Sequence, residues 1–294
     1  MKILYRRILA IVGIGIVSTP LLAMGILRLL RPQTTNWEEE LFPGIYYERQ
    51  IKEQPRPIIN HTVTIDLTKP NLKFFVTPGK SNPHQREFRA ETTTDFLRSY
   101  SLQLAINGSL FSNFQPRFPW NHYPRSGDGV DVEGLVISEG QVYSEAKYGW
   151  PVLCILEGNR LEINPFDCPE NTQSALAGTN LVVIDGKVVE QGTDIGATKL
   201  DPRTAVAIDK QGKKLWVVVI DGRQPGYSEG VTLEELGNLL KELGAVSALN
   251  LDGGGSTAMI MEEGKGVKVL NSPIHTRIPL RQRPVANHLG IYID

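Results

Sequence analysis

The segment that decides the fold begins Leu215-Trp-Val-Val-Val-Ile220-Asp-Gly222 and ends Val246-Ser-Ala-Leu-Asn250-Leu-Asp-Gly-Gly-Gly-Ser-Thr257. Its two apolar runs, 215–220 and 246–251, have the length and composition of buried strands. Between them, Thr232 and Glu235 form a capping box, leucines at 233, 236, 240 and 243 mark one helix face, and Gly244 supplies a stop. The order strand, helix, strand predicts a βαβ crossover over residues 215–251.

The remaining sequence alternates short apolar runs with turn residues. The 28 glycines and 19 prolines predict many tight turns between short strands. Further strands are expected near 62–67, 72–77, 102–106, 134–137, 152–156, 181–184, 205–208 and 257–261, with a short helix at 93–100. Residues 113–130 lack periodicity and predict a long surface loop. We therefore expect an α+β, β-rich fold, in which a central mixed sheet contains the crossover and helices flank it.

Composition and charge restrict the class of partner. Hydrophobic residues make up 41% of the 294-residue chain and charged residues 21%, which is typical of a folded protein. The formal net charge is −1, so no global field attracts nucleic acid and no nucleic-acid partner is expected.

Cys154 and Cys168 fit either one disulfide or two buried thiols. Without CxxC, HxxxH or HExxH spacing, the sequence predicts neither a metal site nor another cofactor.

The first thirty residues differ from the rest. Lys2, Arg6 and Arg7 precede an uncharged apolar run from Ile8 to Leu27, about the length that a membrane-spanning helix needs. This pattern favours an uncleaved signal anchor over 1–30, since the apolar core of a cleaved signal peptide is shorter. The basic flank predicts that the remainder lies outside the cytoplasm. Residues 31–40 are then a tether, and 41–294 form one domain.

Both predicted strands of the crossover end in acidic, glycine-containing turns. Asp221-Gly222 follows the first strand, and Asp252 with Gly253, Gly254, Gly255 and Ser256 follows the second. If the strands are parallel neighbours, both turns open at the same edge of the sheet, where ligands usually bind in crossover units. Each motif taken alone also fits an ordinary turn. Together they predict a site in which glycine N–H groups bind an anion beside a carboxylate.

Two arginines flank the same strands. Arg203 precedes the strand at 205–208, and Arg223 follows the strand at 215–220. A guanidinium offers a fork of permanent donors that suits phosphate, although an exposed arginine is the commonest explanation for any single one. Among the five histidines, His288 is the candidate for substrate binding. The alternative is a buried histidine that is hydrogen-bonded within the core.

These residues together resemble a known family. Pro202-Arg-Thr-Ala-Val-Ala207, Val217-Val-Val-Ile-Asp-Gly-Arg-Gln-Pro-Gly-Tyr227 and Leu249-Asn-Leu-Asp-Gly-Gly-Gly-Ser-Thr-Ala-Met259 resemble motifs of the phosphodiester glycosidase family. The family includes the uncovering enzyme, N-acetylglucosamine-1-phosphodiester α-N-acetylglucosaminidase, and bacterial proteins linked to exopolysaccharide. Ala105-Ile-Asn-Gly-Ser-Leu-Phe111 and Arg283-Pro-Val-Ala-Asn-His288 are similar to its earlier and carboxyl-terminal motifs. Ser109 departs from the pattern, because a second glycine commonly stands there.

The resemblance implies hydrolysis of a glycosyl–phosphate bond in an envelope or extracellular glycan. It implies that Asp252 supplies the carboxylate, with Asp221 as its partner or as a positioning residue and Glu133 in reserve. Arg203 and Arg223 would hold the phosphate, and Asn107 and Asn250 would bond to the sugar.

Two other functions remain open at this point. The chain could be a non-catalytic module for exopolysaccharide binding or biosynthesis, which keeps the pocket without turnover. It could also be a metal-dependent phosphodiesterase, with Asp221 and Asp252 as ligands of a hard cation.

Overall fold

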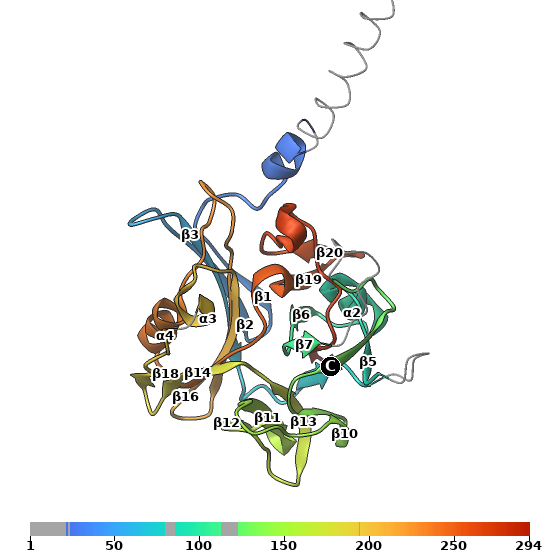
Figure 1. Cartoon of the computed structure of the whole chain (residues 1–294). Coiled ribbons are helices and arrows are strands. Elements are labelled where there is room, and N and C mark those ends of the chain that lie inside the picture. The colour runs from blue at the N-terminus through green and yellow to red at the C-terminus, as the bar shows by residue number, and fades with distance from the viewer. Residues whose placement is uncertain (1–21, 23, 80–85, 113–122, 194) are drawn as a thin grey trace, which may run out of the picture.

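Four β-sheets and a few short helices build the computed structural model of the chain (Figure 1). The structure describes residues 22, 24–79, 86–112, 123–193 and 195–294. The largest sheet has eight strands in the order β1 (Trp37–Phe42), β2 (Ile45–Lys52), β3 (Ile58–Asp66), β17 (Lys214–Ile220), β16 (Arg203–Asp209), β18 (Ala245–Asn250), β14 (Asn180–Ile184) and β15 (Lys187–Val188).

Three smaller sheets complete the β-structure. One five-stranded sheet has the order β20 (Gly266–Val269), β19 (Met259–Glu263), β6 (Leu104–Asn107), β21 (His288–Ile293) and β4 (Leu72–Val76). The other has the order β10 (Gln141–Ser144), β9 (Val136–Ser138), β13 (Thr172–Ala177), β11 (Val152–Leu156) and β12 (Leu161–Asn164). The three-stranded sheet contains β5 (Phe88–Arg89), β8 (Gly129–Val132) and β7 (Phe111–Ser112).

The helices of the described residues are short. Residues 24–29 are helical, the labelled α-helices are α2 (Thr93–Ser99), α3 (Ile195–Thr198) and α4 (Leu233–Glu242), and the 3₁₀ turns are η1 (Glu157–Asn159), η2 (Gly254–Ser256) and η3 (His275–Arg277). The predicted helix at 93–100 is present as α2, and Thr92 caps its amino-terminal end. The capping box of α4 forms as predicted between Thr232 and Glu235.

The prediction of an α+β fold with a central mixed sheet and flanking helices is wrong. Every pairing between the named strands is antiparallel, the strands form several sheets instead of one central mixed sheet, and the helices are few and short. Helix α4 does connect β17 to β18, and the two strands run parallel because β16 is antiparallel to both. They are not neighbours, since β16 lies between them. Strand periodicity identifies a strand but not which strand pairs with it, so the sequence could not exclude this insertion.

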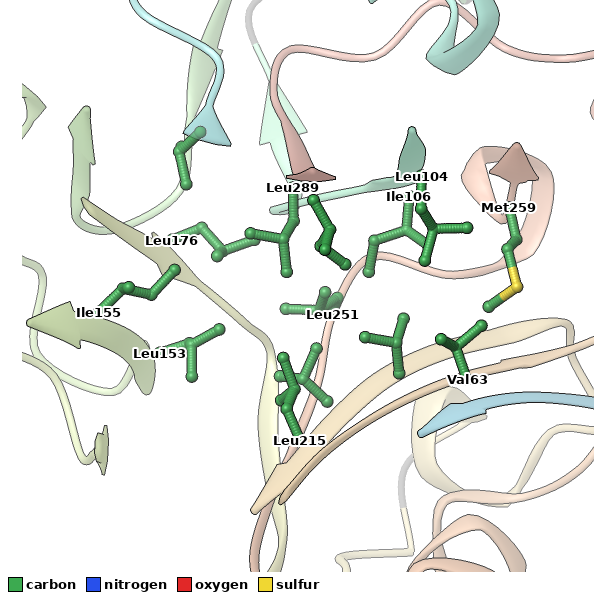
Figure 2. Packing of buried hydrophobic residues seen from close by; sticks show 14 of the residues in the cluster. Val63, Leu104, Ile106, Leu153, Ile155, Leu176, Leu215, Leu251, Met259 and Leu289 are labelled. Carbon is green, nitrogen blue, oxygen red and sulfur yellow. The ribbon is translucent and has the colours of Figure 1, made fainter. Parts of the chain in front are cut away.

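Alternating side chains of the central strands supply two separate cores. On β17, Leu215, Val217 and Val219 face a core shared with the three other sheets, whereas Trp216, Val218 and Ile220 pack in the cluster that contains α4. Figure 2 shows the shared core, where Leu215 lies with Leu153 and Leu176 of one five-stranded sheet and with Ile106 and Leu289 of the other. In Figure 1, α4 covers the face of the large sheet that points away from the other sheets.

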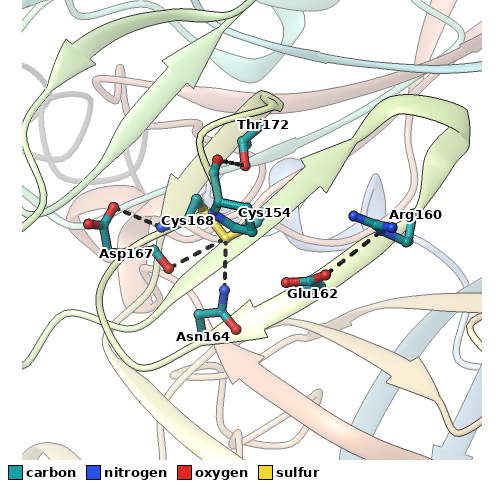
Figure 3. The surroundings of a disulfide bond; sticks show 8 residues. Cys154, Arg160, Glu162, Asn164, Asp167, Cys168 and Thr172 are labelled. Carbon is teal, nitrogen blue, oxygen red and sulfur yellow. Dashed lines mark hydrogen bonds and ion pairs between the residues drawn. A yellow bond between two sulfur atoms is a disulfide. The ribbon is translucent and has the colours of Figure 1, made fainter.

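The two cysteines form a disulfide, which decides between the two alternatives left open by the sequence. Cys154 on β11 bonds to Cys168 in the loop after β12, with the Cα atoms 5.7 Å apart (Figure 3). Asn164 donates a hydrogen bond from Nδ2 to Sγ of Cys154 at 3.6 Å. The bond ties the 165–171 loop to its own sheet.

The structure describes only part of the segment for which the sequence predicts an anchor and a tether, residues 1–40. No helix of the described residues has both the length and the apolar character needed to cross a membrane. Most of the predicted anchor, residues 1–30, lies outside the described residues, as do residues 113–122 of the predicted long loop. The predicted tether, 31–40, contributes the first residues of the edge strand β1.

Candidate functional site

One edge of the large sheet gathers the predicted site. Arg203 opens β16 opposite Ile220, the last residue of β17, and Ala205 pairs with Asn250, the last residue of β18. The turns that begin at Asp221 and Asp252 therefore leave the sheet at the same edge, as predicted, although the strands are not neighbours. After Asp252 the chain makes the 3₁₀ turn η2 and continues into β19 of the next sheet.

Asp252 is a buried carboxylate. Its residue is 8% exposed, and Oδ1 accepts a hydrogen bond from the N–H of Gly253 at 2.9 Å. Oδ2 is buried without a hydrogen-bond partner among the described residues. Burial raises the pKa of Asp252, whereas the Ser256 hydroxyl and the Arg283 guanidinium, followed by the Gly253 N–H and Arg223, act to lower it. An unpaired carboxylate oxygen in such a place is costly and is typical of functional sites.

Two guanidinium groups flank the glycine turn beside Asp252. Arg223 donates from Nε and Nη2 to the two carboxylate oxygens of Asp201, at 2.7 and 2.9 Å, and this pairing raises the pKa of Arg223. Arg283 donates from Nε to Nδ1 of His275 at 3.2 Å and from Nη1 to Oγ of Ser256 at 3.1 Å. Each arginine thus has two of its five N–H donors committed in these bonds.

The three glycines are needed for close packing. A methyl group on Gly254 would lie 2.7 Å from Nη2 of Arg223, and one on Gly255 would lie 2.5 Å from Nη2 of Arg283. A methyl group on Gly253 would lie 2.7 Å from the carbonyl oxygen of Pro202. The glycines therefore allow both guanidinium groups to approach the turn that follows Asp252.

Two of the three glycine N–H groups of the predicted anion cradle, those of Gly253 and Gly254, are already bonded within the protein. The N–H of Gly253 binds Asp252, that of Gly254 donates to the carbonyl of Pro202 at 2.8 Å, and that of Ser256 donates to the carbonyl of Gly253 at 3.2 Å. Donors for an anionic ligand must therefore come mainly from the arginine side chains.

Two adjoining clefts open at this place. The smaller, about 390 Å³, is lined by the turn from Asn250 to Gly255 and by Arg203, Arg223 and Arg283. The larger, about 800 Å³, shares Tyr123, Arg223 and Arg283 with the smaller one. Both volumes lie within the range of small-molecule sites. The guanidinium of Arg283 lies 4.3 Å from the centroid of the Tyr123 ring, so these shared side chains form the boundary between the clefts.

Asn250 lines the smaller cleft, whereas Asn107 does not. Nδ2 of Asn250 donates to Oγ1 of Thr179 at 2.7 Å and to the carbonyl of Leu251 at 2.9 Å, and its Oδ1 has no partner among the described residues. Asn107 is fully buried and donates to the backbone carbonyl of Asp252 at 2.6 Å. Its Oδ1 accepts from Oγ1 of Thr204, so Asn107 holds the backbone of the site in place.

Arg203 lines the smaller cleft, but its guanidinium binds backbone carbonyls. Nε donates to Val231 at 3.1 Å, and Nη2 donates to Gly196 at 2.8 Å and Lys199 at 3.0 Å. Arg203 thereby ties α3 and the segment before α4 to the edge of the sheet. Arg223 and Arg283, by contrast, line both clefts.

Asp221 lies in a buried network and lines neither cleft. Oδ1 accepts from Nδ2 of Asn271 and from the N–H of Ser272 at 3.1 and 2.8 Å, and Oδ2 lies 3.1 Å from Nε2 of His61. His61 is in turn bonded through Nδ1 to the hydroxyl of Tyr47 at 2.7 Å. These bonds occupy both carboxylate oxygens, so the arrangement supports a positioning role for Asp221.

Three other residues singled out in the sequence also lie outside both clefts. His288 is fully buried against the Phe96 ring, and burial lowers its pKa to about 3, which keeps it neutral. Glu133 accepts from Oγ of Ser112 and pairs with Lys147. Ser109 is bonded to the Asn287 side chain and does not narrow either cleft.

The sequence reasoning missed Arg283, Tyr123 and Asp201. Arg283 opens the motif that ends at His288, so the motif was noticed while its first residue was not assigned a role. Burial lowers the pKa of Arg283, and Asp252 acts to raise it. Among the described residues, no group of three or more histidine, cysteine, aspartate or glutamate side chains is arranged to hold a metal ion.

Known structures share this fold. The similar proteins include a hypothetical protein from Synechocystis, with a TM-score of 0.66 and 14% identity over 89% of this chain and 64% of that one. This chain thus spans less than two thirds of the Synechocystis protein. The catalytic domain of zebrafish N-acetylglucosamine-1-phosphodiester α-N-acetylglucosaminidase, auto-inhibited by its pro-peptide, has a TM-score of 0.61 and 17% identity over 92% of this chain and 93% of that one.

A putative exported protein from Burkholderia pseudomallei is also similar, with a TM-score of 0.60 and 14% identity over 80% of this chain and 74% of that one. None of the curated proteins matches the sequence. The model of the phosphodiester glycosidase family matches residues 100–292, a range that contains Asp252, both cleft arginines and the carboxyl-terminal motif. This chain belongs to the phosphodiester glycosidase family.

Proposed function

We propose that the protein hydrolyses the bond between a sugar and phosphate in a sugar 1-phosphodiester of an envelope or extracellular glycan. The observation that carries the proposal is the buried carboxylate of Asp252, with Arg223 and Arg283 beside it at the boundary of two clefts. Positive charge develops on the sugar as this bond breaks, and negative charge remains on the phosphate. A carboxylate next to two guanidinium groups matches both charges.

The reaction requires little from a general acid, because the departing phosphomonoester is a good leaving group. The C1–O bond breaks with its electron pair remaining on the phosphate, where Arg223 and Arg283 stabilise the charge. Ionised Asp252 stabilises the positive charge at C1, water supplies the hydroxyl that C1 acquires, and the remaining proton of that water goes to the released phosphomonoester. Asn250, with an unpaired acceptor in the smaller cleft, bonds to a sugar hydroxyl or acetamido N–H.

The test compares Asp252→Asn with wild type on a panel of sugar 1-phosphodiesters, including one of N-acetylglucosamine. Released sugar and phosphomonoester are both measured. We expect kcat to fall at least about a hundredfold, since the variant removes a charge that acts mainly in the transition state. Glu133→Gln is the control, because it removes a carboxylate outside both clefts and should retain activity. Near-normal turnover by Asp252→Asn would exclude this role.

The same assay separates the two other functions. A non-catalytic exopolysaccharide module would bind the saccharides and release nothing from any of them. A metal-dependent phosphodiesterase would lose activity in a chelator and regain it on addition of a divalent cation. The proposed glycosidase remains active in the chelator. Asp221 has both oxygens bonded within the protein, which does not favour a cation shared with Asp252.

We also propose that the amino-terminal segment anchors the chain in a membrane, with the catalytic domain outside the cytoplasm. The apolar run from Ile8 to Leu27 and the Cys154–Cys168 disulfide support this location, since disulfides persist in oxidising compartments. Protease treatment of intact cells and of inside-out vesicles tests it. Digestion of the domain only in inside-out vesicles would place it in the cytoplasm and overturn the proposal.

A further inference from the structure

The larger cleft carries more positive charge than one phosphodiester requires. Its lining contains four cationic side chains and one carboxylate, that of Glu229. Two of the cations, Arg223 and Arg283, stand at the boundary with the smaller cleft, where the proposed function places the scissile phosphate. The other two, Lys199 and Arg277, line only the larger cleft.

The boundary arginines are sufficient for the scissile group. A phosphodiester has one negative charge, and each of these arginines retains N–H donors after its bonds to Asp201 or to His275 and Ser256. Lys199 and Arg277 are therefore not needed to neutralise it. Their presence in the larger cleft requires another explanation.

The neighbouring carboxylates, Glu229 in the same lining and Asp201 beside it, supply two negative charges against the four cationic side chains. Asp201 is the partner of Lys199 at 3.5 Å, but its two oxygens are already engaged by Arg223. Arg277, at the end of η3, is exposed and forms no ion pair within the described part of the chain. A solvated arginine is the ordinary explanation for one such side chain. Two surplus cations in a cleft that opens from the catalytic boundary favour an anionic ligand.

We propose that the leaving group of the substrate carries a second anionic group, which the larger cleft binds through Lys199 and Arg277. The substrate class is then a sugar 1-phosphodiester whose alcohol part bears a further phosphate, as in sugars joined by repeated phosphodiesters. The sugar occupies the smaller cleft, the scissile phosphate lies at Arg223 and Arg283, and the next phosphate lies in the larger cleft. This inference rests on the proposed function.

Two matched diesters of the same sugar test the inference with the full-length protein. In one, the sugar 1-phosphate is esterified to glycerol; in the other, it is esterified to glycerol that carries a terminal phosphate. We expect kcat/KM to be about tenfold higher for the second compound, the effect of one charge-assisted contact. The difference should lie mainly in KM and should shrink as salt is added.

The double variant Lys199→Gln, Arg277→Gln identifies the side chains responsible. The readout is the ratio of kcat/KM between the two diesters, because a general loss of activity cancels in it. The ratio should approach one. The matched control Arg160→Gln, Lys210→Gln removes the same charge from exposed residues outside both clefts and should retain the wild-type ratio.

The outcomes distinguish the two proposals. Equal cleavage of both diesters by the wild-type protein overturns this inference and leaves the proposed function intact. Release from neither overturns the proposed function; calorimetric affinities of the same two compounds then decide the inference, and equal affinities overturn it. The inference would also be overturned if the control variant lowered the ratio of kcat/KM between the two diesters as much as the Lys199, Arg277 variant does. The effect would then come from net charge alone.

Discussion

At the scale of single residues, the glycines after Asp252 matter because of what packs against them. Gly255 does not have a positive φ, so alanine fits its backbone, but the added methyl group would meet Nη2 of Arg283 at 2.5 Å. A guanidinium at the end of a flexible side chain can move aside at little cost to folding. The position of Arg283 relative to the phosphate would change, and misplaced catalytic groups are costly in rate.

Gly255→Ala should therefore lower kcat/KM by about tenfold or more while changing stability by less than about 1 kcal/mol. Activity on a sugar 1-phosphodiester and the urea midpoint measure the two effects. Gly253→Ala is a useful contrast, because its methyl group would meet the carbonyl of Pro202 at 2.7 Å and the backbone would have to move. Unchanged activity in Gly255→Ala would show that the position of Arg283 is not critical.

The pH dependence of activity should report the charge of Arg283. Burial raises the pKa of Asp252 and Arg283 is among the groups that lower it, so the acid limb should lie above the ordinary value for aspartate. Because the ionised form acts, activity falls as pH falls through this pKa. Arg283→Gln removes a lowering charge and should move the acid limb of the kcat/KM profile to higher pH.

Arg283→Lys is the matched variant for this prediction. It retains the positive charge while losing the forked donor geometry, so kcat/KM should fall and the acid limb should stay close to its wild-type position. If both variants shifted the limb equally, the effect would not be due to the charge of residue 283.

At the scale of elements, the capping box of α4 is a stability feature that the sequence predicted and the structure contains. The N–H of Glu235 donates to Oγ1 of Thr232 at 3.1 Å, and the N–H of Thr232 donates to Oε2 of Glu235 at 2.9 Å. Glu235 also pairs with Arg56, which links the start of α4 to the segment before β3. Thr232→Ala should lower the free energy of unfolding by about 1 kcal/mol.

The urea midpoint measures this change, and Thr232→Ser provides the control because it retains the capping hydroxyl. The helix packs in the core on the opposite face of the large sheet, and its first residue, Leu233, lines the smaller cleft, so activity is measured beside the urea midpoint. A destabilisation as large in Thr232→Ser as in Thr232→Ala would contradict the capping explanation.

Local elements could be predicted because their signals are local. The capping residues of α4, its leucine face and the apolar runs of β17 and β18 each follow from a few neighbouring residues. The order of strands in a sheet has no such signal. Nothing in residues 203–209 indicates that β16 inserts between β17 and β18, because that pairing depends on contacts between segments far apart in the chain.

At the scale of the whole molecule, buried histidines make stability depend on pH. Burial lowers the pKa of His288 to about 3 and, with two nearby arginines, that of His275 to about 4. Below pH 6.5, the ordinary pKa of histidine, these two side chains bind protons in the unfolded chain but not in the folded chain. Stability should therefore decline as pH falls from 6.5 towards these values, by at most about 1.4 kcal/mol per pH unit for each histidine.

Urea midpoints between pH 7 and pH 4.5 measure this decline. His288→Gln removes one titrating group, so its midpoint should fall less steeply over that window, even if the variant is less stable at pH 7. A slope equal to that of wild type would show that protonation of His288 does not contribute.

The sequence by itself determined the family motifs, the edge at which Asp221 and Asp252 leave their strands, and the ends of α4. These features depend on nearby residues or on the parallel direction that the crossover imposes. Only the tertiary structure decided which of those residues share a cleft. It placed Asp252 and Asn250 with Arg223 and Arg283, and it placed Asp221 and His288 in separate buried networks. The reason is physical: burial and hydrogen-bond partners are properties of contacts between distant segments, and a motif contains only its own residues.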